Sequence, residues 1–296
     1  MACSYLVTGA GGFVGRNLIR HITSKEPQSI VLSLPRGSDL TDSLATRNFF
    51  EGTQRLDYIY HLADKSGNHK WTTEHSFDQF STNCKMHLNV LEAWKSYQPQ
   101  AKLIFVSSVW AYPENLTIAS ESDYWAGPLQ AGIAHFGYSK KLVDVALHAA
   151  RQQYGLSGST LVLGTCYGPG DASDHLIPTI IRRMKDDPES LQVYGTGEEC
   201  RDFVFISDQV AALHAHKDTS FDLLNISSGK VTSIREVVET IVELSGYMGK
   251  VCFSSDRSLA STQAVRALDV SKARALQSVP ITFRSLRDGL KQTLGT

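Results

Sequence analysis

The chain has 296 residues, with 29 Lys and Arg against 30 Asp and Glu, so its formal net charge is −1. This near-neutral charge argues against nucleic acid as a partner, and no segment approaches the ~18 apolar residues that a membrane span requires. Five scattered cysteines without a CxxC pair fit a reduced compartment better than a disulfide framework or a zinc site, so we expect a cytoplasmic protein that holds no metal and contacts no membrane.

In chain order, short apolar runs alternate with longer stretches in which apolar residues recur every three or four positions. The apolar runs predict buried strands at residues 5–7, 30–34, 58–62, 103–107 and 159–163. The periodic stretches predict helices at residues 14–23, 82–94 and 136–154. This alternation is typical of an α/β fold with a Rossmann-like, doubly wound parallel sheet.

Beyond about residue 164, proline and glycine divide the chain into short pieces, which indicates a smaller C-terminal substrate-binding lobe. We predict a dinucleotide-binding domain over residues 1–163 and assign residues 164–200 and 223–296 to the smaller lobe. Residues 201–208 have the pattern of a strand, and we expect residues 201–222 to return to the first domain.

A glycine-rich segment follows the first predicted strand and opens the first predicted helix, which is the context of a dinucleotide-binding loop. Gly9 permits a tight turn, Gly12 lets the backbone approach a pyrophosphate, and Gly15 allows close packing of helix and strand. The positive end of the helix dipole then faces the phosphates. The predicted cofactor contacts are Gly9, Gly11, Gly12, Phe13, Val14 and Gly15. The alternative is a glycine-rich turn without a ligand.

The residues after the second predicted strand bear on which dinucleotide binds. NAD-binding proteins usually carry an acidic residue there to hold the ribose hydroxyls. This chain has no carboxylate at that point but has Arg36, whose guanidinium can pair with a 2′-phosphate. We therefore favour NADP(H) over NAD(H), with a merely solvated Arg36 as the alternative. Asp39 and Leu40 are placed to contact the adenine edge.

Further motifs are His61-Leu62-Ala63, Ser107-Ser108-Val109-Trp110-Ala111-Tyr112 and Phe136-Gly137-Tyr138-Ser139-Lys140. With the glycine loop and Asn225-Ile226-Ser227-Ser228-Gly229, they resemble the extended short-chain dehydrogenase/reductases that act on nucleotide sugars, also called the NAD-dependent epimerase/dehydratase family. The resemblance covers essentially the whole chain. Cys166-Tyr167-Gly168-Pro169, His175-Leu176-Ile177-Pro178 and Arg201-Asp202-Phe203 resemble second-lobe landmarks of the GDP-fucose synthase branch, whose members are 3,5-epimerase/4-reductases.

The resemblance implies roles for several side chains. Ser108 would hydrogen-bond the sugar oxygen at C4. Lys140 would hold the nicotinamide ribose and lower the pKa of a tyrosine one helical turn earlier. Arg183 and Arg201 would clamp the diphosphate of a GDP-linked sugar, with ordinary surface charge as the alternative.

The resemblance also has implications for the cofactor pocket and for assembly. Leu62 and Ala63 would border the dinucleotide. The chain would form a homodimer through the predicted helices 82–94 and 136–154, although the same apolar residues could simply pack against the sheet.

The chain departs from the family pattern at the catalytic tyrosine. The residue four positions before Lys140 is Phe136, and only that position shares a helix face with the lysine. Tyr138 should point elsewhere, because it lies roughly 200° further around the helix. Phenylalanine has no hydroxyl, so chemistry at C4 should fall by ~10²–10⁴ while cofactor binding survives. Phe136 is either an engineered Tyr→Phe change, which the otherwise complete site favours, or the mark of a naturally atypical member.

A second departure is Trp110, which stands where the family's epimerases have cysteine. An indole does not exchange protons near neutral pH, so the expected reaction is hydride transfer at C4 of a 4-keto or 4-hydroxy sugar nucleotide. Trp110 and His175 would then contact the substrate. Two alternatives remain open: a bifunctional 3,5-epimerase/4-reductase in which Cys166 replaces the missing cysteine, and a non-catalytic dinucleotide sensor.

Overall fold

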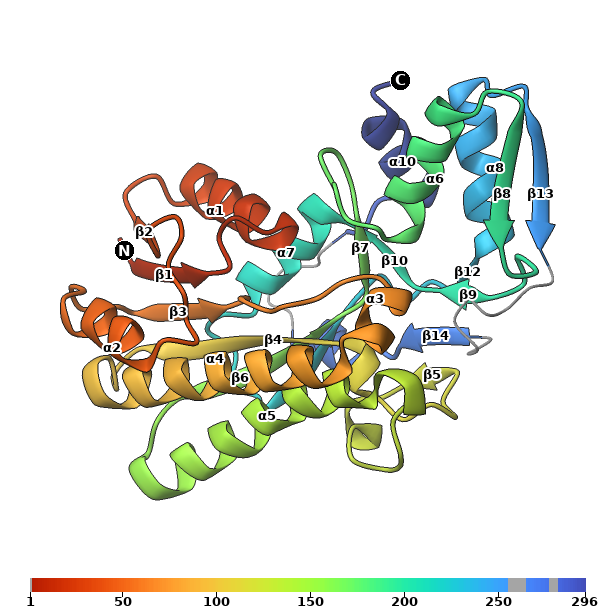
Figure 1. Ribbon diagram of the computed structural model, residues 1–296. Coiled ribbons are helices and arrows are strands. Elements are labelled where there is room, and N and C mark those ends of the chain that lie inside the picture. The colour runs from red at the N-terminus through yellow and green to blue at the C-terminus, as the bar shows by residue number, and fades with distance from the viewer. Residues whose placement is uncertain (1, 255–264, 277–281) are drawn as a thin grey trace.

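The computed structural model describes residues 2–254, 265–276 and 282–296 (Figure 1). Its centre is a six-stranded sheet in which every neighbouring pair is parallel, with the order β11-β6-β4-β3-β1-β2. The strands are β1 (Ser4–Thr8), β2 (Ile30–Ser33), β3 (Tyr58–His61), β4 (Lys102–Ser108), β6 (Gly158–Leu163) and β11 (Leu223–Ile226). The predicted α/β class with a doubly wound parallel sheet is confirmed, and all five predicted strands are present.

Helices cover both faces of this sheet (Figure 1). On one face lie α2 (Ser43–Glu51), α4 (Ser76–Tyr97) and α5 (Ala134–Tyr154), and on the other lie α1 (Phe13–Lys25) and α7 (Ile206–Ala215). Alternate residues of one strand pack into the apolar layers on opposite faces of the sheet, because strand side chains alternate in direction. Tyr5 and Val7 join the cluster around α1 and α7, whereas Leu6 joins the cluster that contains Trp94 of α4. Two apolar cores therefore hold the sheet.

Shorter elements lie beyond the carboxyl ends of the sheet strands. One group in Figure 1 comprises α6 (Leu176–Asp186), β8 (Ser190–Tyr194), α8 (Ile234–Ser245), β13 (Lys250–Ser254) and α10 (Leu286–Leu294). The small sheets add β5 (Ile118–Ala119), β7 (Thr165–Tyr167), β9 (Cys200–Arg201), β10 (Phe203–Phe205), β12 (Thr232–Ser233) and β14 (Val265–Leu268). The remaining α-helices among the described residues are α3 (His69–Glu74) and α9 (Ser271–Leu276).

Two expectations for the second half of the chain need correction. Leu223–Ile226, assigned from sequence to the smaller lobe, pairs with β6 as the edge strand of the central sheet. Residues 201–208 do not form one strand, because β9 pairs with β12 and β14 whereas β10 pairs with β7, and α7 already begins at Ile206. The predicted lobe over residues 223–296 also includes residues 255–264 and 277–281, which lie outside the described residues.

Candidate active site

The glycine loop lies where the sheet reverses its winding, between β1 and β3, which is the usual ligand position in open parallel sheets. Gly9 has φ 69°, and a Cβ on it would stand 2.7 Å from the backbone nitrogen of Ala63. A Cβ on Gly15 would stand 2.3 Å from the carbonyl oxygen of Gly9. The tight turn predicted at Gly9 and the close packing predicted at Gly15 are therefore present, and Leu62 and Ala63 border the loop.

The N-terminus of α1 can accept an anion. The helix begins at Phe13, and its N-cap residue Gly12 makes no side-chain cap hydrogen bond. The first backbone N–H groups of a helix have no partner within it, and the helix dipole favours negative charge there. A Cβ on Gly11 would meet nothing within 4 Å, so space remains over the loop, while Val14 packs into the core. This arrangement fits a pyrophosphate.

The residues expected near the adenosine end lie on or after the loop that follows β2. Arg36 is exposed in a turn with Gly37, so its guanidinium is accessible to a 2′-phosphate. The Asp39 carboxylate instead accepts hydrogen bonds from the backbone and hydroxyl of Thr41, which lower its pKa. Leu40 is buried, and its carbonyl accepts from Asn89. An adenine contact by Asp39 or Leu40 stays a prediction.

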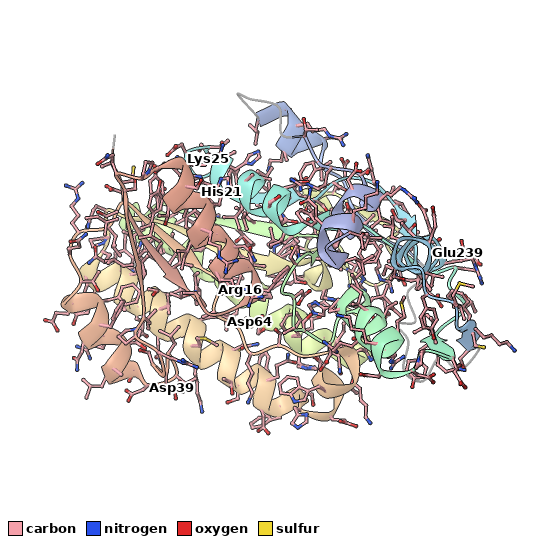
Figure 2. The ribbon with its side chains drawn as sticks, turned by 90° about the horizontal axis from the view of Figure 1, so that it is seen from above. Arg16, His21, Lys25, Asp39, Asp64 and Glu239 are labelled. Carbon is pink, nitrogen blue, oxygen red and sulfur yellow. The ribbon has the colours of Figure 1, made fainter. Side chains whose placement is uncertain are left out.

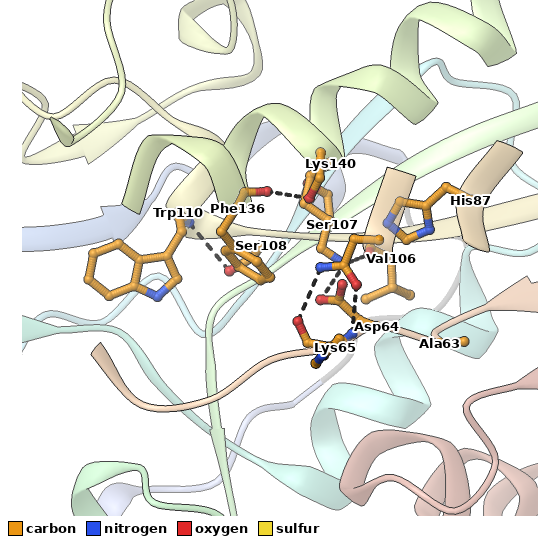
Figure 3. Close-up of polar contacts among 12 residues, drawn as sticks. Ala63, Asp64, Lys65, His87, Val106, Ser107, Ser108, Trp110, Phe136 and Lys140 are labelled. Carbon is orange, nitrogen blue, oxygen red and sulfur yellow. Dashed lines mark hydrogen bonds and ion pairs between the residues drawn. The ribbon is translucent and has the colours of Figure 1, made fainter. Parts of the chain in front are cut away.

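Lys140, on α5, is the charged centre of the site (Figure 3). Its ammonium nitrogen lies 2.9 Å from Oδ2 of Asp64 and donates to the carbonyl oxygen of Val106 at 3.2 Å. The ring centroids of Phe136 and Phe105 lie 5.6 Å and 5.0 Å from the same nitrogen. The lysine side chain is only 5% exposed, so its charge is balanced within the protein by a carboxylate.

The helix-face argument for position 136 is confirmed in its geometry. Phe136 is buried beside Lys140, whereas Tyr138 is 47% exposed and lies near Lys141 instead. Two buried tyrosines have other partners: the Tyr112 hydroxyl donates to Asn225, and the Tyr124 hydroxyl is hydrogen-bonded to Ser107. Phe136 therefore leaves the space beside Lys140 without a phenol hydroxyl. Whether it is an engineered residue stays a prediction.

Ser108 and Trp110 follow the carboxyl end of β4. The Ser108 hydroxyl accepts a hydrogen bond from the Trp110 backbone nitrogen at 3.3 Å (Figure 3). The Trp110 indole lies under the guanidinium of Arg266, 3.7 Å from its ring centroid. Arg266 pairs in register with Arg201 in the β9–β14 ladder. Burial, followed by the charge of Arg201, lowers the pKa of Arg266 to about 9, so the two guanidinium groups act on each other in this corner of the site.

The other predicted second-lobe residues lie apart from this pair. Arg183, on α6, donates to the carbonyl oxygen of Gln192 on β8, and its guanidinium covers Tyr194. His175 is exposed at the N-terminal boundary of α6. Its role and a joint clamp by Arg183 and Arg201 stay predictions. Burial raises the pKa of Cys166 to about 12, which makes its thiol a poor proton-exchange group near neutral pH.

Sequence reasoning missed two features of the site. Asp64 was not singled out, although an acidic residue just beyond the carboxyl end of a buried parallel strand was a usable signal. The second feature is a buried chain behind the loop, in which Nδ1 of His61 lies 2.7 Å from the Thr8 hydroxyl and Nε2 lies 2.9 Å from Nδ1 of His87. Motif matching found His61 only as a landmark.

A glycine loop at the switch point of a parallel sheet is the arrangement with which many α/β proteins bind dinucleotides. Residues 5–226 match the model of the NAD dependent epimerase/dehydratase family, and the chain belongs to that family. This agrees with the resemblance read from the motifs.

Relatives include the "GDP-L-fucose synthase" of Dictyostelium discoideum, which is 26% identical, with 97% of this chain and 93% of the relative covered. A solved "GDP-mannoheptose C4 reductase" from Campylobacter jejuni with NADP bound has a TM-score of 0.85 at 21% identity, covering 99% of this chain and 98% of that one. A GDP-L-fucose synthetase from Naegleria fowleri has a TM-score of 0.87 at 21% identity, covering 99% and 92%. No described helix is long and apolar enough to cross a membrane.

Proposed function

We propose that this protein binds NADP(H) and transfers hydride to or from C4 of a 4-keto or 4-hydroxy sugar linked to a nucleoside diphosphate, with GDP favoured. The observation that carries the proposal is Phe136 beside the buried Lys140, whose partner Asp64 directly follows the residue that packs on the glycine loop. Support comes from relatives described as acting on GDP-sugars and from solved neighbours that contain NADP or NADPH. The dinucleotide would supply the hydride; the protein would supply binding, orientation and charge.

The chain's own residues divide the work by position. The backbone N–H groups at the start of α1 would bind the pyrophosphate, and Arg36 would favour the 2′-phosphate of NADP(H). Lys140 would hold the nicotinamide ribose, and the Ser108 hydroxyl would orient the sugar oxygen at C4. Arg201 would face the substrate diphosphate from the corner that it shares with Arg266. No tyrosine moves the proton, so turnover is slow.

Restoring the phenol tests the proposal. NADPH oxidation is followed by absorbance with a GDP-4-keto-6-deoxy sugar, in the unaltered chain, in Phe136→Tyr and in the control Tyr138→Phe on the exposed face of α5. We expect tight NADPH binding in all three and a gain of ~10²–10⁴ in kcat only for Phe136→Tyr. Failure to bind NADPH would refute the proposal.

The same assay separates the two alternatives. Binding of NADPH without turnover in Phe136→Tyr would favour the dinucleotide sensor, for which the missing hydroxyl and the Lys140–Asp64 pair are the specific observations. In deuterated water, label at C3 and C5 of the product would show the epimerase. We expect none, since Trp110 is an indole and Cys166 holds its proton.

We also propose that the chain forms a homodimer through α4 and α5. Large apolar side chains are exposed along these two helices, among them Phe77, Leu88 and Val145. Such a surface is typical of an interface between copies. Light scattering should give twice the 32.6 kDa chain mass, and Val145→Glu should halve it. A monomeric unaltered chain would exclude this assembly.

A further inference from the structure

Asp64 has a buried carboxylate, and only one of its two oxygens has a hydrogen-bond or ion-pair partner among the described residues. Its Oδ2 lies 2.9 Å from the Lys140 nitrogen (Figure 3), and its side chain is only 12% exposed. Its Oδ1 is buried and has no hydrogen-bond partner among the described residues. A buried carboxylate oxygen without a donor is costly, because it has lost its water. Such an atom next to a cofactor-binding loop is suited to accept a hydrogen bond from a ligand.

The position of Asp64 decides which ligand can supply that bond. Asp64 directly follows Ala63, whose backbone nitrogen packs on Gly9 of the glycine loop. In the view from above (Figure 2), Asp64 projects next to Arg16, which lies one turn into α1. Asp64 therefore lies directly beside the glycine loop, and that loop has space for a ligand at Gly11. A dinucleotide bound there would bring its own hydroxyls toward this carboxylate.

The chemistry of the pair favours a sugar diol over an anion. Lys140 offers hydrogen-bond donors, and Oδ1 of Asp64 offers an acceptor, so together they present no net charge. A vicinal diol matches this arrangement, because one hydroxyl can accept from the ammonium while its neighbour donates to the carboxylate. An added phosphate would instead be repelled by Asp64.

We propose that Asp64 is a ribose-binding and positioning residue: Oδ1 accepts a hydrogen bond from a hydroxyl of the ribose on the nicotinamide side, while Oδ2 holds Lys140 in place. The inference rests on the proposed function, since it requires a dinucleotide on the glycine loop. It adds a carboxylate to the residues that the motifs assigned to the cofactor. It also explains how a buried lysine keeps its position when Phe136 offers no hydroxyl.

Calorimetric titration compares two probes that differ in the relevant ribose. NADPH contains the nicotinamide-side ribose, and adenosine 2′,5′-bisphosphate lacks it. In Asp64→Asn we expect the Kd of NADPH to rise about 10-fold or more, the usual effect of losing a hydrogen bond to a charged group. The Kd of the bisphosphate should stay within about twofold. The matched control is Asp78→Asn, the same change at an exposed position on α4.

The outcomes separate this inference from the proposed function. Equal weakening of both probes would show that Asp64 serves the local structure alone, and unchanged NADPH binding would exclude the contact; either result overturns the inference and leaves the proposed function standing. If the unaltered chain binds neither probe, both fall.

An NADPH analogue without hydroxyls on the nicotinamide-side ribose gives a test in which the unaltered chain is itself informative. The unaltered chain should bind this analogue at least 10-fold more weakly than NADPH, and the difference should shrink in Asp64→Asn. An undiminished difference in the variant would overturn the inference. Equal binding of NADPH and the analogue by the unaltered chain would overturn it even if Asp64→Asn failed to fold.

Discussion

Acid should destabilise this protein through the histidine behind the glycine loop. His61 is fully buried, and both ring nitrogens are engaged by Thr8 and His87. Burial, assisted by the positive charge of Lys140, lowers the pKa of His61 to about 3. The folded chain therefore keeps this ring neutral at a pH where the unfolded chain, with a pKa near 6.5, already binds a proton. The resulting stability is present above pH 6.5 and is lost as the pH falls toward 3.

The size of the effect follows from the two pKa values. A pH of 5 lies about 1.5 units below the pKa of His61 in the unfolded chain, and each unit is worth about 1.4 kcal/mol. This residue alone therefore lowers the free energy of unfolding by about 2 kcal/mol at that pH. His87, buried beside it, has a pKa lowered for the same main reason and acts in the same direction. The pH dependence is therefore steep on the acid side.

Urea denaturation at pH 7.5, 6.0 and 5.0 measures this dependence. We expect His61→Gln to be less stable than the unaltered chain, but its free energy of unfolding should depend less on pH. Near pH 5.5 the slope of that free energy against pH should be smaller by about 1 kcal/mol per pH unit. His148→Gln, at an exposed position on α5, reports the effect of removing a histidine elsewhere. An unchanged slope in His61→Gln would show that the buried ring does not resist protonation, and the reasoning would fail.

Three further outcomes are expected. Gly15→Ala should weaken NADPH binding at least 10-fold in calorimetry, because its methyl group would press on the Gly9 carbonyl oxygen; normal affinity would mean that the loop adapts freely. Arg36→Ala should reduce the preference for NADPH over NADH roughly 10-fold, and an unchanged ratio of the two Kd values would show that Arg36 is only solvated. Asp208→Asn should lower the free energy of unfolding measured in urea by about 3 kcal/mol, because it removes the charge of the buried carboxylate that pairs with Arg284. A loss under 1 kcal/mol would contradict that account.

Local patterns explain why the sequence predicted part of the site. The glycine loop lies between a strand and a helix that its neighbours specify, and the i, i+4 spacing places Phe136 beside Lys140 whatever the rest of the chain does. The partners of these residues come from distant segments. The residues next to Lys140 in the sequence do not indicate that Asp64 is its counter-ion. Those next to Trp110 do not indicate that Arg266 lies over the indole ring. Such contacts depend on strand order and loop paths, which periodicity does not encode.

The same limit explains the misplaced edge strand. Leu223–Ile226 is a four-residue run between Asp222 and a serine- and glycine-containing turn, so its length and surroundings resemble the small-lobe elements around it. Its membership of the central sheet follows from tertiary packing, because β6 is buried along its whole length and needs a partner on its outer side. The sequence reveals that the strand exists more readily than where it pairs.

This pairing has a consequence during synthesis on the ribosome. All six residues of β6 are buried in the finished protein, and its outer edge is closed only by β11, about 60 residues later in the chain. A nascent chain between these points exposes an apolar strand edge that other chains can join. Truncations ending between residues 164 and 222 should therefore precipitate, whereas extension past Ile226 removes the bare edge.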